Sequence, residues 1–149
     1  NLVVPAIEVV SNDNVQIHKW KKPTVGLIKA NMDASVKKNM GTGLGVIFRN
    51  HLVQVLAAAS LLIPHCYKPH VAEVVALRWA TEMTKDQIFD SVQYEIDCKK
   101  LVDAWNGNHF HHSSYFEGVI QDCALLINRR NFHSLSFVNR IENKAPDCL

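Results

Sequence analysis

The sequence lacks the features that mark membrane proteins, zinc fingers and disordered chains. No stretch of its 149 residues approaches 18 consecutive apolar residues, so we expect no membrane-spanning helix. The four cysteines, Cys66, Cys98, Cys123 and Cys148, include no Cys-x-x-Cys pair and have no histidine partner at zinc-finger spacing. A content of 48% hydrophobic and 20% charged residues, without low-complexity tracts, instead indicates one globular domain with its own core.

The chain also lacks a strong charge imbalance and a signal peptide. The formal net charge of +2 is too small to indicate a nucleic-acid partner by itself, so any partner has to be argued from a site. The even number of cysteines leaves two disulfides open, but the missing signal peptide and the size of the core favour reduced thiols. Because the sequence begins with Asn1 and stops at Leu149, we expect a segment of a longer polypeptide.

Hydrophobic periodicity predicts alternating strands and helices over most of the chain. Residues 1–24 contain several proline and asparagine residues and show weak periodicity, which is typical of a linker or N-terminal arm before a domain at 25–149. Strands are predicted at residues 26–33, 43–50, 51–63, 91–97 and 132–140, and helices at 70–85, 98–105 and 115–130.

The order of these elements predicts an α/β fold with a mixed sheet and helices packed on its faces. The first three strands follow one another closely, with a hairpin turn predicted at Asn50-His51, so we expect them to be antiparallel. Residues 141–149 are predicted to form a loop that enters a final helix.

Four carboxylates lie at the ends of these predicted elements. Asp33 ends the first strand, and Glu73 falls in the first turn of the first helix. Asp97 ends the fourth strand, and Asp147 lies where the final helix would begin. Carboxylates gathered on one patch of a sheet repel one another unless cations neutralise them, and oxygen ligands of this kind suit Mg²⁺ or Mn²⁺.

Each carboxylate taken alone also has a simpler interpretation. Asp33 could be a turn or capping residue, and Glu73 could be a helix-start carboxylate favoured by the helix dipole. Asp97 could cap the helix predicted at 98–105. Their occurrence together at element ends is the observation that favours metal binding.

Five short motifs occur in order between residues 20 and 149, and together they are far more specific than any one of them. Their residues are Trp20, Pro23, Gly26, Lys29, Asn31, Asp33 and Ser35; then Gly43, Gly45, Val46 and Arg49; then Ala72, Glu73, Ala76 and Leu77; then Glu95, Asp97, Leu101 and Val102; and finally Arg140, Asn143 and Asp147. With these motifs the chain resembles the plant ribonuclease H-like domain, which is found at the end of retroelement reverse transcriptases or standing alone.

The resemblance implies a ribonuclease H-like fold with a five-stranded mixed sheet, here truncated in its last helix. It implies hydrolysis of the RNA strand of an RNA–DNA hybrid with two Mg²⁺ or Mn²⁺ ions, one activating the attacking water and the other stabilising the leaving 3′ oxygen. The catalytic and metal-binding residues would be Asp33, Glu73, Asp97 and Asp147.

Other implications concern the substrate and the setting of the protein. Ala34, Ser35 and Asn143 lie at positions expected to contact the substrate. The expected partner is nucleic acid rather than a membrane, and the chain is expected to act as a monomer or within a larger polypeptide. The expected location is intracellular, with the nucleus favoured.

Some residues depart from the family pattern and keep other functions open. Ala34 stands where the family has Gly, Pro146 stands where it has Ala, and residues 108–114 lack the Lys and Arg of the basic protrusion that some relatives carry. One alternative is therefore a catalytically weakened or inactive domesticated copy that serves as a nucleic-acid-binding or interaction module. Another is a related nuclease that acts on a different nucleic acid.

Overall fold

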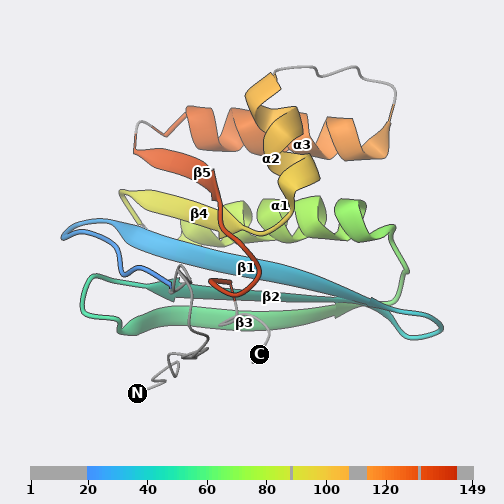
Figure 1. The fold of residues 1–149 in the computed structure, drawn as a ribbon, viewed down its shortest axis with the longest axis horizontal. Helices are drawn as coiled ribbons and strands as arrows, with labels where there is room; N and C mark the ends of the chain where they lie inside the picture. The colour runs from blue at the N-terminus through green and yellow to red at the C-terminus, as the bar shows by residue number, and fades with distance from the viewer. Residues whose placement is uncertain (1–19, 88, 108–113, 131, 144–149) are drawn as a thin grey trace, which may run out of the picture.

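The computed structural model describes residues 20–87, 89–107, 114–130 and 132–143, which form one sheet of five strands and three helices (Figure 1). In chain order the elements are β1 (Ile28–Lys37), β2 (Gly41–Arg49), β3 (Val55–Ile63), α1 (Pro69–Gln87), β4 (Val92–Ile96), α2 (Lys99–Gly107), α3 (Tyr115–Asn128) and β5 (His133–Phe137).

The strands lie in the order β3-β2-β1-β4-β5, so β1 is at the centre of the sheet (Figure 1). β1 pairs antiparallel with β2, and β2 pairs antiparallel with β3. β4 is parallel to both of its neighbours, β1 and β5. The prediction of a mixed five-stranded sheet whose first three strands are antiparallel is confirmed.

Alternation along β1 separates an apolar face of the sheet from a polar face. Ala30 and Met32 are fully buried and belong to the core, on the side where α1 lies against β1. Lys29, Asn31 and Asp33 alternate with them and therefore point to the opposite face. These three polar side chains are nonetheless buried, with none more than 8% exposed. The second face of β1 is thus a buried polar layer.

The first strand is longer than the sequence pattern predicts. It runs to Lys37, because Asp33 pairs with Gly45 and Ser35 pairs with Gly43 of β2. Asp33 therefore lies within the strand rather than at its end.

The connection between β2 and β3 is also longer than the predicted turn at Asn50-His51. It spans residues 50–54, where the Asn50 side chain accepts hydrogen bonds from the backbone N–H groups of Leu52 and Gln54. Val53 adopts a φ of 62°, a left-handed conformation that the pattern of apolar residues gave no reason to expect. Of the loop and final helix predicted at residues 141–149, residues 141–143 form a turn and the remainder lies outside the described residues.

Three of the four cysteines lie in the described residues. Cys66, Cys98 and Cys123 carry free thiols. Burial raises the pKa of the Cys123 thiol to about 12, so this residue stays protonated and packs in the core.

None of the helices in the described part of the chain has the length and apolar character that a membrane span requires.

Gly41 is a position where the fold requires glycine. Its φ is 126°, and an added Cβ would lie 2.2 Å from the carbonyl oxygen of Ile63. We expect Gly41→Ala to lower the free energy of unfolding by about 2 kcal/mol or more. Gly118→Ala is the matched control, because a Cβ there meets nothing within 4 Å. This substitution in α3 should raise the free energy of unfolding by about 0.5–1 kcal/mol. Urea unfolding measures both variants, and a Gly41→Ala protein of undiminished stability would contradict this close approach.

Candidate metal centre

Three of the four predicted carboxylates meet at one place beside the sheet. One oxygen atom from each of Asp33, Glu73 and Asp97 lies within 4.8 Å of the other two. Asp33 comes from β1, Glu73 from α1, and Asp97 from the position directly after β4. The fourth, Asp147, lies outside the described residues.

The parallel pairing of β1 with β4 explains how the two aspartates come together. The last pair of this ladder matches Asn31 with Glu95. Asp33 and Asp97 each follow two residues later, so both continue the alternation on the side of Asn31 and Glu95. Sequence reasoning identified both residues, but the pairing register that joins them is not visible in either segment.

Glu73 reaches the cluster from the helix that covers the other face of β1. Glu73 is the fifth residue of α1, and the first turn of this helix contains no acidic residue. Glu73 therefore lies just past the first turn, in which it was predicted to lie. Pro69 begins the helix, where its missing N–H costs no hydrogen bond. The backbone N–H of Ala34 donates a hydrogen bond to the Glu73 carboxylate, which ties α1 to β1 at the site.

The cluster is electrostatically strained in the absence of a cation. Burial raises the pKa of the Glu73 carboxyl to about 9, and the charges of Asp33 and Asp97 and a hydrogen bond to Asp33 act in the same direction. The Oε2 atom of Glu73 is buried and has no hydrogen-bond partner among the residues that the structure describes. A divalent cation that prefers oxygen ligands, such as Mg²⁺ or Mn²⁺, fits this all-carboxylate donor set.

A hollow of about 530 Å³ opens on the sheet beside Asp33. Two of the residues predicted to contact substrate, Ala34 and Ser35, line it. Gly43 and Gly45, which also line it, contribute no side chains and so leave room for a ligand. Of the three carboxylates, Asp33 is the one that lines this hollow.

Asn143, the third residue predicted to contact substrate, lies elsewhere. It is 1% exposed, and its side-chain amide bonds to Asn31 and to the backbone of Met32. Its burial does not favour a direct contact with substrate, which stays a prediction.

Two features of the folded chain had no role assigned to them from the sequence. Arg140 lines the hollow next to Asp33 and supplies a positive charge there, although the motifs marked it without suggesting a role. A second hollow of about 960 Å³ is lined by aromatic and basic residues from three separate segments, including Tyr67, Lys68, Lys100 and Tyr115. Only the folded chain brings these segments together, so no local pattern could have revealed this second hollow.

Comparisons with known proteins bear on the family and the fold of the chain. The family described as "Reverse transcriptase-like" matches residues 31–149. No curated protein matches the sequence. Among solved structures, the ribonuclease H1 of the archaeon Halobacterium salinarum superposes with a TM-score of 0.73 at 20% identity, covering 83% of this chain and 93% of that one.

Two further structures are similar to the chain. The N-terminal RNase H domain of a Mycobacterium tuberculosis protein has a TM-score of 0.71 at 18% identity and covers 83% of this chain and 89% of that one. LC11-RNase H1, isolated from compost and solved in complex with an RNA/DNA hybrid, has a TM-score of 0.69 at 21% identity. The match covers 82% of this chain and 92% of that one. At these identities the likeness establishes the shared fold.

The raised pKa of Glu73 predicts that the metal-free protein loses stability as the pH rises. The folded-state pKa of about 9 lies above the ordinary value of 4.5, so the folded protein holds an extra proton between these values. This contribution is complete below pH 4.5 and is lost as the pH rises toward 9. Thermal unfolding with EDTA present should show the decline, and Glu73→Gln should flatten it. Identical pH profiles for the two proteins would contradict the assignment.

The cluster also predicts stabilisation by divalent cations. At pH 8, Mn²⁺ at about 100 times its dissociation constant should add about 2.7 kcal/mol to the free energy of unfolding. Asp33→Asn should abolish this gain, which is measured as a shift of the melting temperature. Asp103→Asn is the matched control, because Asp103 is an exposed carboxylate paired with Lys99 in α2. A gain that survives Asp33→Asn would place the cation elsewhere.

Proposed function

Because this chain belongs to the reverse transcriptase-like family, we propose that it is a metal-dependent endonuclease that hydrolyses the RNA strand of RNA–DNA hybrids by a two-metal mechanism. The observation that carries the proposal is the meeting of Asp33, Glu73 and Asp97 within 4.8 Å on a ribonuclease H-like fold. Similar structures are ribonuclease H1 proteins, and one of them was solved with an RNA/DNA hybrid.

The proposed ligands are Asp33, Glu73 and Asp97, with Asp147 as the fourth from its place in the sequence. Two bound divalent ions would supply an activated water and stabilisation of the leaving 3′ oxygen. In the metal-free protein the Glu73 carboxyl keeps its proton at neutral pH, because its pKa is raised to about 9. Metal binding requires the ionised carboxylate, so binding releases this proton.

The substrate strand is proposed to lie in the hollow beside Asp33. Ser35 is exposed there and offers a hydroxyl group, while Arg140 offers a guanidinium group that can pair with phosphate. The glycines of β2 allow a sugar–phosphate backbone to approach the sheet. A contact to the 2′-hydroxyl is what would let such a site select RNA.

The placement of Ala34 bears on the alternative of a non-catalytic binding module. Ala34 alternates with Asp33 along β1, and it packs against the core on the side of α1. Its methyl group therefore points away from the face that carries the Asp33 carboxylate. The replacement of Gly by Ala thus leaves that face open and gives no reason to favour an inactive site.

Cleavage of a labelled RNA–DNA hybrid tests the proposal. We expect cleavage of the RNA strand with Mg²⁺ or Mn²⁺ and none with EDTA. Asp33→Asn and Asp97→Asn should each lower kcat by more than about 100-fold, because each removes a ligand of the ions. Asp103→Asn should retain the activity.

The outcomes separate the three candidate functions. A folded chain that binds the hybrid but never cleaves it would replace the proposal with the binding module. Equal cleavage of single-stranded RNA and hybrid would indicate a nuclease of different substrate class.

A further inference from the structure

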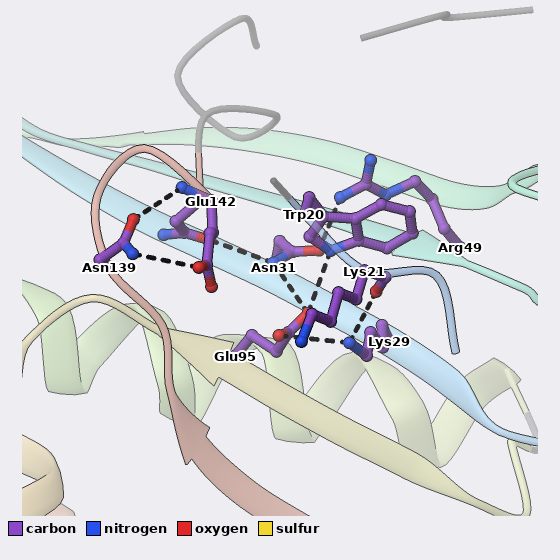
Figure 2. Close-up of polar contacts among 9 residues, drawn as sticks. Trp20, Lys21, Lys29, Asn31, Arg49, Glu95, Asn139 and Glu142 are labelled. Carbon is purple, nitrogen blue, oxygen red and sulfur yellow. Dashed lines mark hydrogen bonds and ion pairs between the residues drawn. The ribbon is translucent and has the colours of Figure 1, made fainter. Parts of the chain in front are cut away.

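A second group of polar side chains lies on the polar face of the sheet, and the proposed function does not use it; Figure 2 draws its contacts. It comprises Trp20, Lys29, Asn31, Arg49, Glu95 and Asn143, from strands β1, β2 and β4 and from the segments that precede β1 and follow β5. Asn31 is fully buried, and Arg49, Glu95 and Asn143 are at most 4% exposed. Burying polar groups is costly unless they are hydrogen-bonded, and the bonds within this group offset much of that cost. Arg49 Nε is the exception in the group, because it is buried without a partner among the described residues.

Asn31 is at the centre of the group, as Figure 2 shows. Its Oδ1 accepts a hydrogen bond from Arg49 Nη2 at 2.7 Å. Its Nδ2 lies 3.4 Å from Glu95 Oε1 and 3.2 Å from Asn143 Oδ1. One side chain on β1 therefore joins β2, β4 and the segment after β5.

Glu95 is held from a second direction by the segment before β1. Trp20 Nε1 donates to Glu95 Oε1 at 3.0 Å, and the Trp20 ring lies over the Arg49 guanidinium with 3.6 Å between the ring centroid and Cζ. Lys29 Nζ is 3.5 Å from Glu95 Oε2 and donates to the carbonyl oxygen of Lys21 at 2.7 Å. The Glu95 carboxylate is thus held by side chains of β1 and of the segment before it.

These contacts lie one step from the carboxylate cluster. Asn31 and Glu95 form the last β1–β4 pair, and Asp33 and Asp97 follow them on the same face. Asn143 Nδ2 also donates a hydrogen bond of 2.8 Å to the carbonyl oxygen of Met32. Met32 is the residue directly before Asp33. Asn143 therefore bonds to both of the residues that precede Asp33 in β1.

We propose that these six residues form a polar brace that holds Asp33 and Asp97 at the separation that metal binding requires. The proposal rests on the proposed function and makes Asn143 a positioning residue. Carboxylates of like charge tend to move apart, and a buried hydrogen-bonded scaffold opposes this movement in a way that apolar packing does not. Side chains that orient metal ligands commonly control the affinity for the metal.

Asn143→Leu tests the brace, because it removes the amide and keeps a side chain of similar size. In the full chain, the Mn²⁺ concentration for half-maximal binding, measured by calorimetry, should rise about 10–100-fold. The kcat for hybrid cleavage should fall at low Mn²⁺ and recover at saturating Mn²⁺, while the KM for the hybrid stays unchanged. Trp20→Phe removes the N–H donor to Glu95 and leaves a smaller ring over Arg49, and it should shift the Mn²⁺ midpoint in the same direction by a smaller factor. It keeps the test valid if Asn143→Leu does not fold.

Tyr94→Phe is the matched control. It removes a buried hydroxyl that lies 3.0 Å from Thr84 Oγ1 and 3.2 Å from His133 Nδ1, on the core side of β4. It should lower the melting temperature and leave the Mn²⁺ midpoint unchanged.

An equal shift of the Mn²⁺ midpoint in Tyr94→Phe would overturn the brace. A raised KM in Asn143→Leu would also overturn it and would assign Asn143 to substrate contact. If the unaltered chain neither binds Mn²⁺ nor cleaves hybrid, the proposed function fails and the brace fails with it. If the unaltered chain is active and the brace variants bind Mn²⁺ as tightly as it does, the brace is wrong and the proposed function stands.

Discussion

The parallel pairing of β1 with β4 is the constraint on which the candidate site depends. Its register sets Asn31 beside Glu95, and the two aspartates follow on the same face. A slip of one residue would turn Asp33 into the apolar layer under α1. It would also leave the buried groups around Asn31 without partners, which is costly in a region of low dielectric. The polar layer therefore lies beside the site and also favours this one register of β1 and β4.

The same crowding explains both the strain of the cluster and its suitability for a cation. Three carboxylates with oxygen atoms within 4.8 Å repel one another, and the metal-free fold limits the repulsion by keeping a proton on Glu73. A divalent cation would replace that proton and satisfy the buried carboxylate oxygen. The predicted loss of stability at alkaline pH and the proposed affinity for metal thus have one physical origin, the crowding of these carboxylates.

Periodicity predicted the strands, the helices and the antiparallel start of the sheet, because alternation and helical repeats are local properties. It also marked Asp33, Glu73 and Asp97, since each lies near the end of a predicted element or motif. It could not predict that β1 continues past Asp33, because that depends on pairing with residues 41–44 of β2. The role of Trp20 was equally hidden, because its partner Glu95 is 75 residues away. Asn143 was marked as a substrate residue, and only its bonds to Asn31 and Met32 suggest a different role.

The most direct test of the central claim is anomalous diffraction from crystals of the chain soaked in Mn²⁺. The account predicts an anomalous peak in contact with carboxylate oxygens of Asp33, Glu73 and Asp97, with the Asn31–Glu95 pair unchanged beside it. Peaks confined to other surfaces at saturating Mn²⁺, with the three carboxylates left without a cation, would contradict the account.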